Sequence, residues 1–252
     1  MTDLQGRVTL VTGSSRGIGA AIARAFAGEG AAVVVHGRDP QAVAKVQEQI
    51  VTAGGTAMSA VADVTDLAQI EAMRTSIENE LGPVELLIAN AGGNPTPPLP
   101  VEEITEEGWH AAIQTNLGAT FLTIKAFLPG MKDRRRGTII TMSSAAARRP
   151  TTGSPIAYAA AKAGIELLTQ ETALQAGPFG IRVNCIAPET ILTDRNRQQI
   201  PLPVQEQLRQ AHPIQRLGTP EDVADAALFL ASPRAAWISG ITVDVAGGSV
   251  LA

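Results

Sequence analysis

The chain has 252 residues, of which 45% are hydrophobic and 17% charged, and it contains 24 glycines. These values are typical of one large α/β domain, which buries roughly three quarters of its unfolded surface. A formal net charge of −4 excludes the basic field that attracts nucleic acid or an anionic membrane. No apolar run approaches the ~18 residues of a membrane span, and the first residues lack the pattern of a secretory leader. We therefore expect a cytoplasmic protein with no nucleic-acid or membrane partner.

A single cysteine, Cys185, excludes an internal disulfide and fits a reducing compartment. It lies in an apolar strand pattern with no histidine nearby, so we interpret it as a buried structural thiol and not as a nucleophile. His36, His110 and His212 are far apart and show no metal-ligand spacing. We therefore expect no metal site.

Short apolar runs alternate with helical patterns along the whole chain. The predicted strands span residues 8–12, 33–36, 57–61, 85–89, 137–142, 181–187 and 241–244. The predicted helices span residues 18–29, 39–52, 66–80, 105–114, 116–133 and 220–230, with one more around Tyr158. This alternation predicts an α/β Rossmann fold, a doubly wound seven-stranded parallel sheet with helices on both faces. No repeat or linker interrupts it, so we expect residues 1–252 to form a single domain.

A glycine-rich turn lies between the first predicted strand and the first predicted helix. It reads Thr12-Gly13-Ser14-Ser15-Arg16-Gly17-Ile18-Gly19. Bare backbone N–H groups and a helix N-terminus can meet an anion there, and glycine lets a pyrophosphate approach closely. The strand–turn–helix context therefore favours nucleotide binding over a purely structural turn.

Tyr158 and Lys162 form a second motif. We interpret Ser154 as a helix N-cap and Pro155 as the first helical residue, which puts Tyr158 and Lys162 one turn apart on one face. A tyrosine that works near neutral pH needs about 4 kcal/mol of phenolate stabilisation, whereas an exposed ammonium supplies about 1 kcal/mol. If Tyr158 is a catalytic acid or base, Lys162 must act in a dry pocket beside a second cation, such as an oxidised nicotinamide ring. Alone, the pair also fits an ordinary surface contact.

With these motifs in place, the chain resembles the short-chain dehydrogenase/reductase family over essentially its whole length. The matching features are the glycine turn, Asp63-Val64, Asn90-Ala91-Gly92, Asn116, Ser144, Tyr158-x-x-x-Lys162, Asn184 to Pro188, and Arg216-x-Gly-x-Pro220-Glu221. The pattern is most similar to 3-oxoacyl-(acyl-carrier-protein) reductases and related ketone reductases. The resemblance implies a catalytic tetrad of Asn116, Ser144, Tyr158 and Lys162.

The resemblance also assigns the tetrad its roles in hydride transfer to a carbonyl carbon. Ser144 would hydrogen-bond the carbonyl oxygen and Tyr158 would protonate it. Lys162 would lower the pKa of Tyr158 and hold ribose hydroxyls, and Asn116 would position a water that supplies protons to Lys162. Ser143 is the alternative serine. We prefer Ser144, which stands fourteen positions before Tyr158, already one more than the commonest spacing in the family.

The cofactor-binding residues are carried over from the resemblance in the same way. Contacts are implied with adenine (Asp63, Val64), with the adjacent ribose face (Asn90, Gly92), and with the nicotinamide amide and phosphates (Ile191, Thr193). The whole expected set is Gly13, Ser15, Arg16, Gly17, Ile18, Gly19, Arg38, Asp63, Val64, Asn90, Ala91, Gly92, Tyr158, Lys162, Pro188, Ile191 and Thr193.

The choice between NADP and NAD depends on the end of the second predicted strand. A carboxylate there would accept from a ribose 2′-OH and repel a 2′-phosphate. The position is Gly37, followed by Arg38, and Arg16 lies in the glycine turn. Asp39 is close, but we interpret Asp39-Pro40 as a helix cap. Two cations therefore favour NADP(H) over NAD.

Several features bear on the substrate. Glu189 follows Pro188 where the family usually has glycine, which puts a carboxylate near the nicotinamide end. The terminal Asp-Gly-Gly pattern of the family is displaced, with Asp244 two residues early. Arg148 and Arg149 are interpreted as solvated or interface charges. The pocket is expected from residues 93–100, 145–156 and 189–212, and the polar, irregular segment 188–218 is expected to be a mobile lid.

The leading hypothesis is an NADPH-dependent reductase of a ketone or 3-oxoacyl group. The alternatives are an NAD(P)-dependent sugar, polyol or other secondary-alcohol dehydrogenase, and a non-catalytic NADP-binding sensor or scaffold. The basic run 132–136 would suit an acidic carrier protein, although a solvated helix end explains it equally and Phe179 stands where a second basic residue is expected. The resemblance implies a homotetramer that uses the helices around 105–133 and 155–176.

Overall fold

The computed structural model describes residues 4–95, 97–150 and 154–250. Seven strands form one sheet in the order β3-β2-β1-β4-β5-β6-β7, and every neighbouring pair is parallel. The strands are β1 (Val8–Val11), β2 (Ala32–Gly37), β3 (Thr56–Val61), β4 (Leu86–Ala89), β5 (Gly137–Met142), β6 (Ile181–Pro188) and β7 (Thr242–Val245). The prediction of a doubly wound parallel sheet is confirmed.

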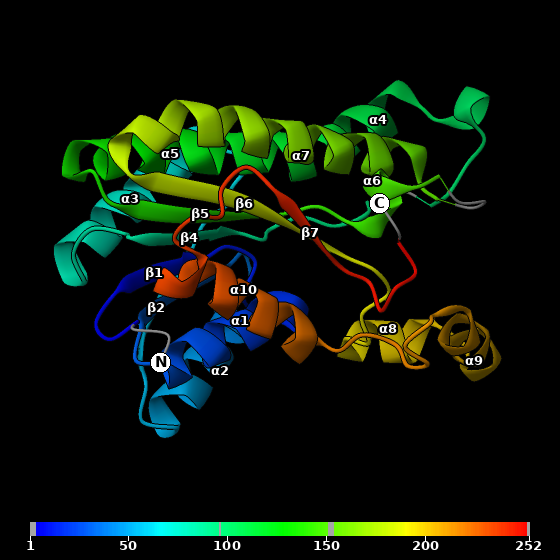
Figure 1. Cartoon of the computed structure of the whole chain (residues 1–252), viewed down its shortest axis with the longest axis horizontal. Coiled ribbons are helices and arrows are strands. Elements are labelled where there is room, and N and C mark those ends of the chain that lie inside the picture. Colours follow the sequence, from blue (N-terminus) through cyan, green and yellow to red (C-terminus); the bar gives the residue numbers. More distant parts are fainter. Residues whose placement is uncertain (1–3, 96, 151–153, 251–252) are drawn as a thin grey trace.

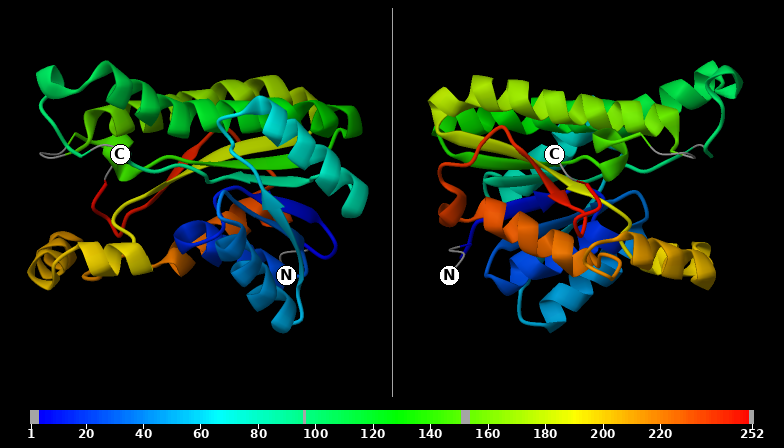
Figure 2. Two further views of the ribbon diagram at one scale, coloured as in Figure 1. Left: turned by 180° about the vertical axis from the view of Figure 1, so that it is seen from behind. Right: turned by 45° about the vertical axis from the view of Figure 1, so that its right-hand side comes forward.

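Helices cover both faces of the sheet (Figures 1 and 2). The helices of one face are α1 (Gly17–Gly28), α2 (Pro40–Thr52) and α10 (Pro220–Ala231). The helices of the other are α3 (Leu67–Glu80), α4 (Glu106–Ile113), α5 (Ala119–Arg134) and α7 (Ile156–Ala176). Helix α1 packs along α10, and α7 packs on α4 and α5. The crossovers between parallel strands are right-handed. Because the sheet is extended from β1 toward β3 on one side and toward β7 on the other, the two sets of crossover helices lie on opposite faces.

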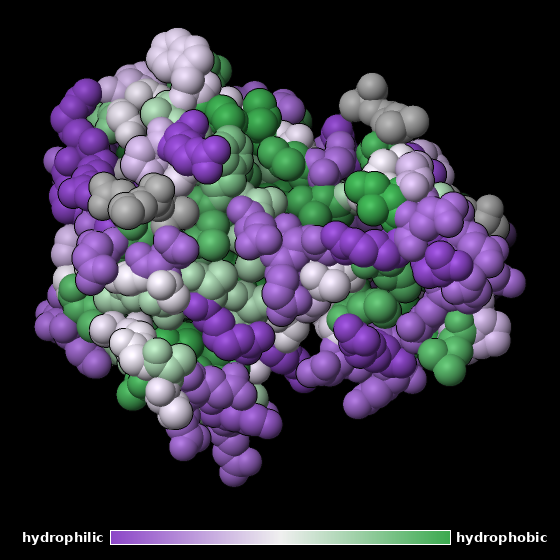
Figure 3. Space-filling view, turned by 60° about the horizontal axis from the view of Figure 1, so that its bottom comes forward, coloured by the Kyte–Doolittle hydropathy of each residue, from purple (hydrophilic) through white to green (hydrophobic). Residues whose placement is uncertain are grey.

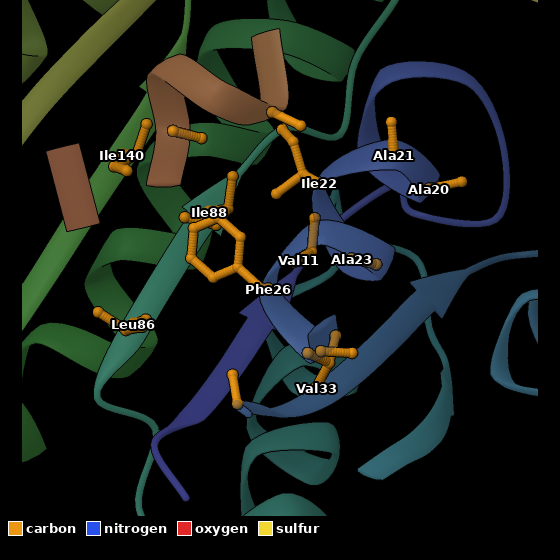
Figure 4. Close-up of a cluster of buried hydrophobic side chains, with 14 of the residues drawn as sticks. Val11, Ala20, Ala21, Ile22, Ala23, Phe26, Val33, Leu86, Ile88 and Ile140 are labelled. Carbon is orange, nitrogen blue, oxygen red and sulfur yellow. The ribbon is translucent and has the colours of Figure 1, made fainter. Parts of the chain in front are cut away.

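Each face of the sheet has its own hydrophobic core. On the α1 side, Phe26 is fully buried among side chains of α1 and of the neighbouring strands, including Ile88 (Figure 4). On the α5 side, Leu87 of β4 joins Phe127 and Met131 of α5. Adjacent residues of β4 thus enter opposite cores, because side chains alternate along a strand. Burial on both faces explains why the central strands are apolar at every position.

The order of the strands reverses between β1 and β4. The chain builds β2 and β3 on one side of β1 and then returns to build β4 to β7 on the other. This reversal opens a crevice at the carboxyl ends of the strands, where ligands of such sheets bind. The segments singled out in the sequence follow the ends of β1, β4, β5 and β6, so the fold brings them to this edge.

Helix α7 starts one residue later than predicted. It begins at Ile156, and Pro155, not Ser154, holds the N-cap position. The reason is that Pro155 has an extended ψ of 107°, so the chain turns into the helix only after the proline. Tyr158 and Lys162 still lie one turn apart on the same helix. Thr152 and Gly153, at the end of the preceding loop, lie outside the described residues.

The segment 188–218 is more regular than predicted. It contains α8 (Asp194–Gln199) and α9 (Leu202–Ala211), and Thr193 caps α8 by accepting from the N–H of Asn196 at 3.2 Å. Both helices lie at one end of the molecule (Figure 1). The side of the surface on which they lie is largely hydrophilic (Figure 3). The sequence-based prediction of irregular structure was wrong, because these helices are short and carry few apolar residues. Their role as a lid stays a prediction.

Residues 114–118 also differ from the prediction of two separate helices. They form a π-helical turn, Gln114–Gly118, that joins α4 to α5 without a break. A π-turn inserts an extra residue into a helix and is frequent at functional sites. It contains Asn116. Within the described parts of the chain, no helix is long and apolar enough to cross a membrane.

Candidate active site

The glycine turn between β1 and α1 is shaped for close approach of an anion. Gly13 and Gly17 have φ of +65° and +56°, a conformation that L side chains rarely adopt. A Cβ at Gly19 would collide with the carbonyl oxygen of Gly13. Arg16 occupies the N-cap of α1 without a side-chain cap hydrogen bond, and the first turn holds no acidic residue. The positive end of α1 is therefore left to an external anion, which fits a pyrophosphate.

His36 holds this turn against β2, a role that the sequence analysis missed. Its Nδ1 accepts from the N–H of Gly13 at 3.0 Å, and its Nε2 lies 3.1 Å from the carbonyl oxygen of Ala62. The ring is therefore neutral with the proton on Nε2. Burial lowers the pKa of His36 to about 4, which keeps it neutral. The backbone N–H and carbonyl of His36 also bond to Ser14. No sequence signal marks His36, because its partners come from two other segments.

Asn90 fastens the same turn from the end of β4. Its Nδ2 donates to the carbonyl oxygens of Thr12 and Gly13 at 2.9 and 3.2 Å. The backbone N–H groups of Asn90 and Ala91 both donate to Oγ1 of Thr12 at 3.0 Å. The side-chain amide of Asn90 is thus used to fix the turn. A contact of Asn90 with ribose stays a prediction.

Two adjoining cavities lie at the carboxyl edge of the sheet and share Gly13, Arg16, Gly92 and Gly93. The first, of about 420 Å³, is called the catalytic cavity here, and the second, of about 500 Å³, the adenosine-side cavity. Of the predicted residues, the catalytic cavity is also lined by Ile18, Gly19, Asn90, Ser144, Tyr158, Lys162, Pro188, Ile191 and Thr193. The adenosine-side cavity is also lined by Ser15, Arg38, Asp63, Val64 and Ala91. The fold therefore brings nearly all predicted site residues together.

Two predicted residues line neither cavity. Gly17 lies under Thr193, where a Cβ would be 3.3 Å from Cγ2 of Thr193. Asn116 is fully buried in the π-turn, behind the wall of the cavities. Its Nδ2 donates to the carbonyl oxygens of Ala112 and Gly93, each at 2.8 Å, and its Oδ1 accepts from the N–H of Gly93 at 3.0 Å. Asn116 therefore fixes the loop after β4. Its predicted role in holding a water stays a prediction.

Ser144 and Tyr158 face each other in the catalytic cavity. Ser144 lies two residues after the end of β5. It accepts from the N–H of Ala146 at 3.2 Å as the N-cap of α6 (Ala145–Arg148), and it hydrogen-bonds Tyr158. The hydroxyl of Ser143 instead donates to Oε1 of Glu166 at 2.7 Å and to the carbonyl oxygen of Lys162 at 3.1 Å. This geometry favours Ser144 over Ser143 as the serine that meets a substrate oxygen.

Lys162 is buried at the wall of the catalytic cavity. Its side chain is buried, and its Nζ donates to the carbonyl oxygen of Met142 at 2.7 Å and lies 5.5 Å from the centre of the Tyr158 ring. Burial lowers the pKa of Lys162 to about 8. Burial also raises the pKa of Tyr158, and the hydrogen bond with Ser144 opposes that rise. The protein alone therefore does not lower the pKa of Tyr158, and the need for a second cation remains.

The adenosine-side cavity carries more positive than negative side chains. It is lined by the three guanidinium groups of Arg16, Arg38 and Arg195 and by the two carboxylates of Asp39 and Asp63. Asp39 caps α2 as predicted, accepting from the N–H groups of Gln41 and Ala42 at 3.0 and 3.2 Å. Arg195 was missed by the sequence analysis, because the position of α8 over the cavity depends on the fold.

Gly37 cannot be replaced by a carboxylate residue without rearrangement. A Cβ at this position would lie 3.0 Å from both Oγ of Ser15 and Cγ2 of Val43. The guanidinium of Arg38 is three quarters exposed and lies 3.9 Å from Oδ2 of Asp63. Oδ1 of Asp63 is bound to Thr65, whose two donors hold the pKa of Asp63 below its usual value. The end of β2 therefore presents a largely free cation.

Arg148 differs from the predicted solvated or interface charge. Its side chain is one quarter exposed and forms ion pairs with Asp244 at 3.0 Å and Glu166 at 3.1 Å. These hydrogen bonds raise the pKa of Arg148. The two ion pairs of Arg148 join α6 to α7 and to β7. Arg149 is exposed and forms no ion pair with the described residues.

The basic run 132–136 lies at the end of α5 and leads into the first residue of β5, Gly137. Lys132 and Arg135 lie over the ring of Phe179, at 4.9 and 5.8 Å from its centre. Arg136 pairs with Glu85 at 2.8 Å. Within this chain, the run is at the amino end of β5 and the catalytic cavity is at the carboxyl end.

A family model described as enoyl-(acyl carrier protein) reductase matches residues 13–249. The chain belongs to the short-chain dehydrogenase/reductase family. The 3-oxoacyl-(acyl-carrier-protein) reductase of Vibrio harveyi is 36% identical over 250 residues, which cover 98% of each chain. Among solved structures, a gluconate 5-dehydrogenase of Burkholderia cenocepacia in complex with NADP and tartrate has a TM-score of 0.91 and 32% identity, covering 98% of this chain and 96% of its own.

A second structure, a 7α-hydroxysteroid dehydrogenase complexed with NADH and 7-oxo glycochenodeoxycholic acid, has a TM-score of 0.92 and 36% identity. The match covers 98% of this chain and 95% of that one. Relatives of similar identity thus act on different substrates and are bound to different nicotinamide cofactors. The family assignment establishes an oxidoreductase that acts on an alcohol or a carbonyl with a nicotinamide cofactor.

We expect replacement of Lys162 by methionine to abolish turnover and to stabilise the fold. A pKa lowered from 10.5 to about 8 corresponds to about 3 kcal/mol of penalty for the buried ammonium, offset by about 1 kcal/mol for the lost hydrogen bond to Met142. The free energy of unfolding of Lys162→Met should therefore exceed that of the natural protein by about 2 kcal/mol at pH 7. Urea denaturation measures this difference.

The pH dependence distinguishes this cause from a packing effect. Because the unfolded state binds the proton more tightly, the penalty is full below pH 8 and disappears as the pH rises toward 10.5. The stability advantage of Lys162→Met should shrink over that range. The exposed Lys45→Met, on α2, serves as the control and should change stability by less than about 0.5 kcal/mol. A methionine variant less stable than the natural protein at pH 7 would contradict the assignment.

Proposed function

We propose that the protein is an NADP(H)-dependent oxidoreductase that interconverts a ketone, including a 3-oxoacyl group, and the corresponding alcohol. The observation that carries this proposal is the convergence of Ser144, Tyr158 and Lys162 in one cavity beside the open N-terminus of α1. A hydroxyl pair that can hold an oxygen, a buried ammonium and an anion-binding turn are the parts that such a reaction needs. We place the enzyme in the cytoplasm, where the buried thiol of Cys185 stays reduced.

The side chains of the cavity account for the proton chemistry. The nicotinamide supplies or accepts the hydride. In the reductive direction, Ser144 donates a hydrogen bond to the substrate oxygen, and Tyr158 transfers its proton to that oxygen as the carbon–hydrogen bond forms. Lys162 stabilises the resulting phenolate, and the proton of Tyr158 is restored from solvent. In oxidation, the same groups act in reverse, with Tyr158 as the base.

The preference for NADP over NAD is supported by charge at the end of β2. Arg16 and Arg38 line the adenosine-side cavity, and Gly37 carries no carboxylate that would bind a ribose 2′-OH. Guanidinium groups bind phosphate oxygens through paired hydrogen bonds. We expect Arg38 and Arg16 to bind the 2′-phosphate.

The polyol and sugar alternative has one observation in its favour. The carboxylate residue Glu189 lines the catalytic cavity, where the family usually has glycine. A carboxylate accepts from hydroxyl groups and repels anions, which suits a hydroxylated substrate better than an acidic carrier protein. We therefore retain secondary-alcohol and polyol oxidation as the second candidate.

The assignment of Tyr158 as the proton donor predicts a separation of binding from chemistry. We expect Tyr158→Phe to lower kcat at least 10³-fold with every substrate, because phenylalanine cannot donate a proton. The Kd for NADPH should stay within threefold, since the hydroxyl contacts Ser144 and not the glycine turn. Stopped-flow turnover and fluorescence titration measure the two quantities. Undiminished turnover by Tyr158→Phe would refute the mechanism. A natural protein that bound NADPH without reducing any ketone would instead support the sensor hypothesis.

The assignment of the two arginines predicts a change of cofactor preference. We expect Arg38→Ala to raise the Kd for NADPH about tenfold, because about 1.4 kcal/mol of a phosphate contact is lost, and to leave the Kd for NADH unchanged. Arg16→Ala should act in the same direction. Arg24→Ala removes an exposed arginine of α1 that lies outside both cavities, and it should change neither Kd. Equal losses for NADH and NADPH would show that Arg38 does not bind the 2′-phosphate.

We propose that the enzyme is a homotetramer with subunit contacts on α5 and α7. Phe121 of α5 and Leu167 and Leu174 of α7 are 48%, 59% and 76% exposed in the isolated chain. Large apolar side chains exposed together mark contact surfaces. Light scattering should give four times the 26.2 kDa chain mass, and Leu167→Glu with Leu174→Glu should give smaller species. Val51→Glu, at an exposed site on α2, serves as the control. A natural protein that scatters as a monomer would overturn this proposal.

A further inference from the structure

A third cavity, of about 360 Å³, adjoins the catalytic cavity. The two share Glu189 and Thr190, which follow β6. The rest of its wall comes from the segment between α9 and α10 and from the end of β7. The lining residues are Glu189, Thr190, His212, Ile214, Arg216, Gly218, Asp222, Asp244, Val245, Ala246, Gly247 and Gly248. We call it the distal cavity.

His212 lines the distal cavity and holds a buried ring nitrogen without a partner among the described residues. Its side chain is 4% exposed, and its Nδ1 lies 2.6 Å from the carbonyl oxygen of Leu208. Because a carbonyl oxygen only accepts, Nδ1 carries the proton and donates it, and Nε2 of the neutral ring is an acceptor. Nε2 is buried and has no hydrogen-bond partner among the described residues. Such buried polar atoms are rare, and an ordered water or a ligand group satisfies them.

Glu189 presents a second acceptor at the junction of the two cavities. Its backbone N–H donates to the carbonyl oxygen of Val245 at 3.1 Å, which fixes its place beside β7. Its carboxylate accepts from Oγ1 of Thr190 at 3.3 Å, and no cation of the described chain lies within ion-pair distance. A carboxylate can accept several hydrogen bonds, so most of its capacity is free.

The other charged residues of the distal cavity are already paired. Asp222 forms a bidentate pair with Arg216, with both bonds at 2.6 Å, and Asp244 binds Arg148 from behind the wall. Of the three carboxylates in the lining, Asp222 and Asp244 are offset by Arg216 and Arg148, and Glu189 alone has no ion pair within the described residues. Its free groups accept hydrogen bonds, and its field repels anions.

We propose that the distal cavity is a substrate subsite for a hydrogen-bond donor, a hydroxyl or ammonium group, carried by the ketone or alcohol that reacts at Tyr158. Glu189 and Nε2 of His212 accept from this group. The subsite deepens and rests on the proposed oxidoreductase function. It selects hydroxylated or amino-substituted substrates and rejects those that carry a carboxylate or phosphate at the same end.

A matched series of straight-chain 2-ketones, four to eight carbons long, tests the selection. The compounds differ only in the far end, which is methyl, hydroxyl, ammonium or carboxylate. We expect kcat/KM at the best chain length to be at least tenfold higher for hydroxyl and ammonium than for methyl, and lowest for carboxylate. A methyl or carboxylate compound that equals the hydroxyl compound overturns the proposal.

Two conservative variants assign the effect to the named atoms. Glu189→Gln keeps an acceptor but removes the charge, so the ammonium advantage should fall about tenfold and the hydroxyl advantage less than threefold. His212→Asn keeps a donor for the carbonyl oxygen of Leu208 but leaves no acceptor at the position of Nε2, so both advantages should fall at least threefold. Each advantage is the ratio of kcat/KM to that of the methyl compound with the same variant, so a general change of activity cancels. Equal losses with all four compounds mean a merely structural role for these residues and overturn the proposal.

Glu221→Gln is the control for general electrostatics. Glu221 lies in the first turn of α10, next to Asp222, and does not line the distal cavity. The Glu221→Gln substitution removes one negative charge near the distal cavity and should leave kcat/KM for each of the four compounds within twofold of its original value. An effect equal to that of Glu189→Gln would show that net charge, not the subsite, sets the preference.

A binding measurement separates failure of this inference from failure of the proposed function. Calorimetry on Tyr158→Phe with NADP⁺ present measures Kd for the four matched 2-alcohols without turnover. Tighter binding of the amino and hydroxy alcohols, with the amino advantage reduced about tenfold in the double variant with Glu189→Gln, supports the subsite even where no ketone is reduced. Binding that is independent of Glu189 refutes the subsite, even where the methyl ketone is reduced and the proposed function stands.

Discussion

The buried ammonium of Lys162 is the constraint on which the rest of the site depends. Removing a charge from water is costly, and a single carbonyl oxygen, that of Met142, receives one of its three donors. The cost is sustained because β5 and α7 hold the two residues rigidly at the carboxyl edge of the sheet. An ammonium kept in a dry cavity acts on Tyr158 with little screening by solvent. Because burial also raises the pKa of Tyr158, phenolate chemistry needs the further positive charge of an oxidised nicotinamide.

Three polar side chains near the site fix the backbone around it. His36 and Asn90 bind the glycine turn from two strands, and Asn116 binds both backbone groups of Gly93 from the π-turn. Each joins the end of one strand or helix to a loop from another. Backbone N–H groups bind an anion well only when they are held in place before it arrives. The rigidity of the turn therefore comes from side chains that need not touch the cofactor.

The strands and helices of the sheet could be predicted because the patterns that mark them lie within short stretches of the sequence. Apolar runs and glycine spacing mark β1, α1 and the turn between them, and the Tyr158–Lys162 spacing marks one helix face. Long-range contacts were not predictable in the same way. Arg148 was interpreted as solvated because its partner Asp244 lies 96 residues away, and the unused acceptor of His212 exists only in the folded chain. The helices α8 and α9 were missed because they have little apolar surface for a periodic pattern to reveal.

The cleft carries opposite charge at its two ends. The adenosine-side cavity has three guanidinium groups against two carboxylates, and in the distal cavity Glu189 alone has no ion pair within the described residues. A dinucleotide is a polyanion, so this field draws its phosphates toward Arg16 and Arg38 and away from Glu189. The same field would oppose an anionic substrate at the far end, where Glu189 has no cation to offset it. In the proposed arrangement, charge separates the cofactor from the substrate, and Glu189, which follows Pro188, lies at the boundary between them.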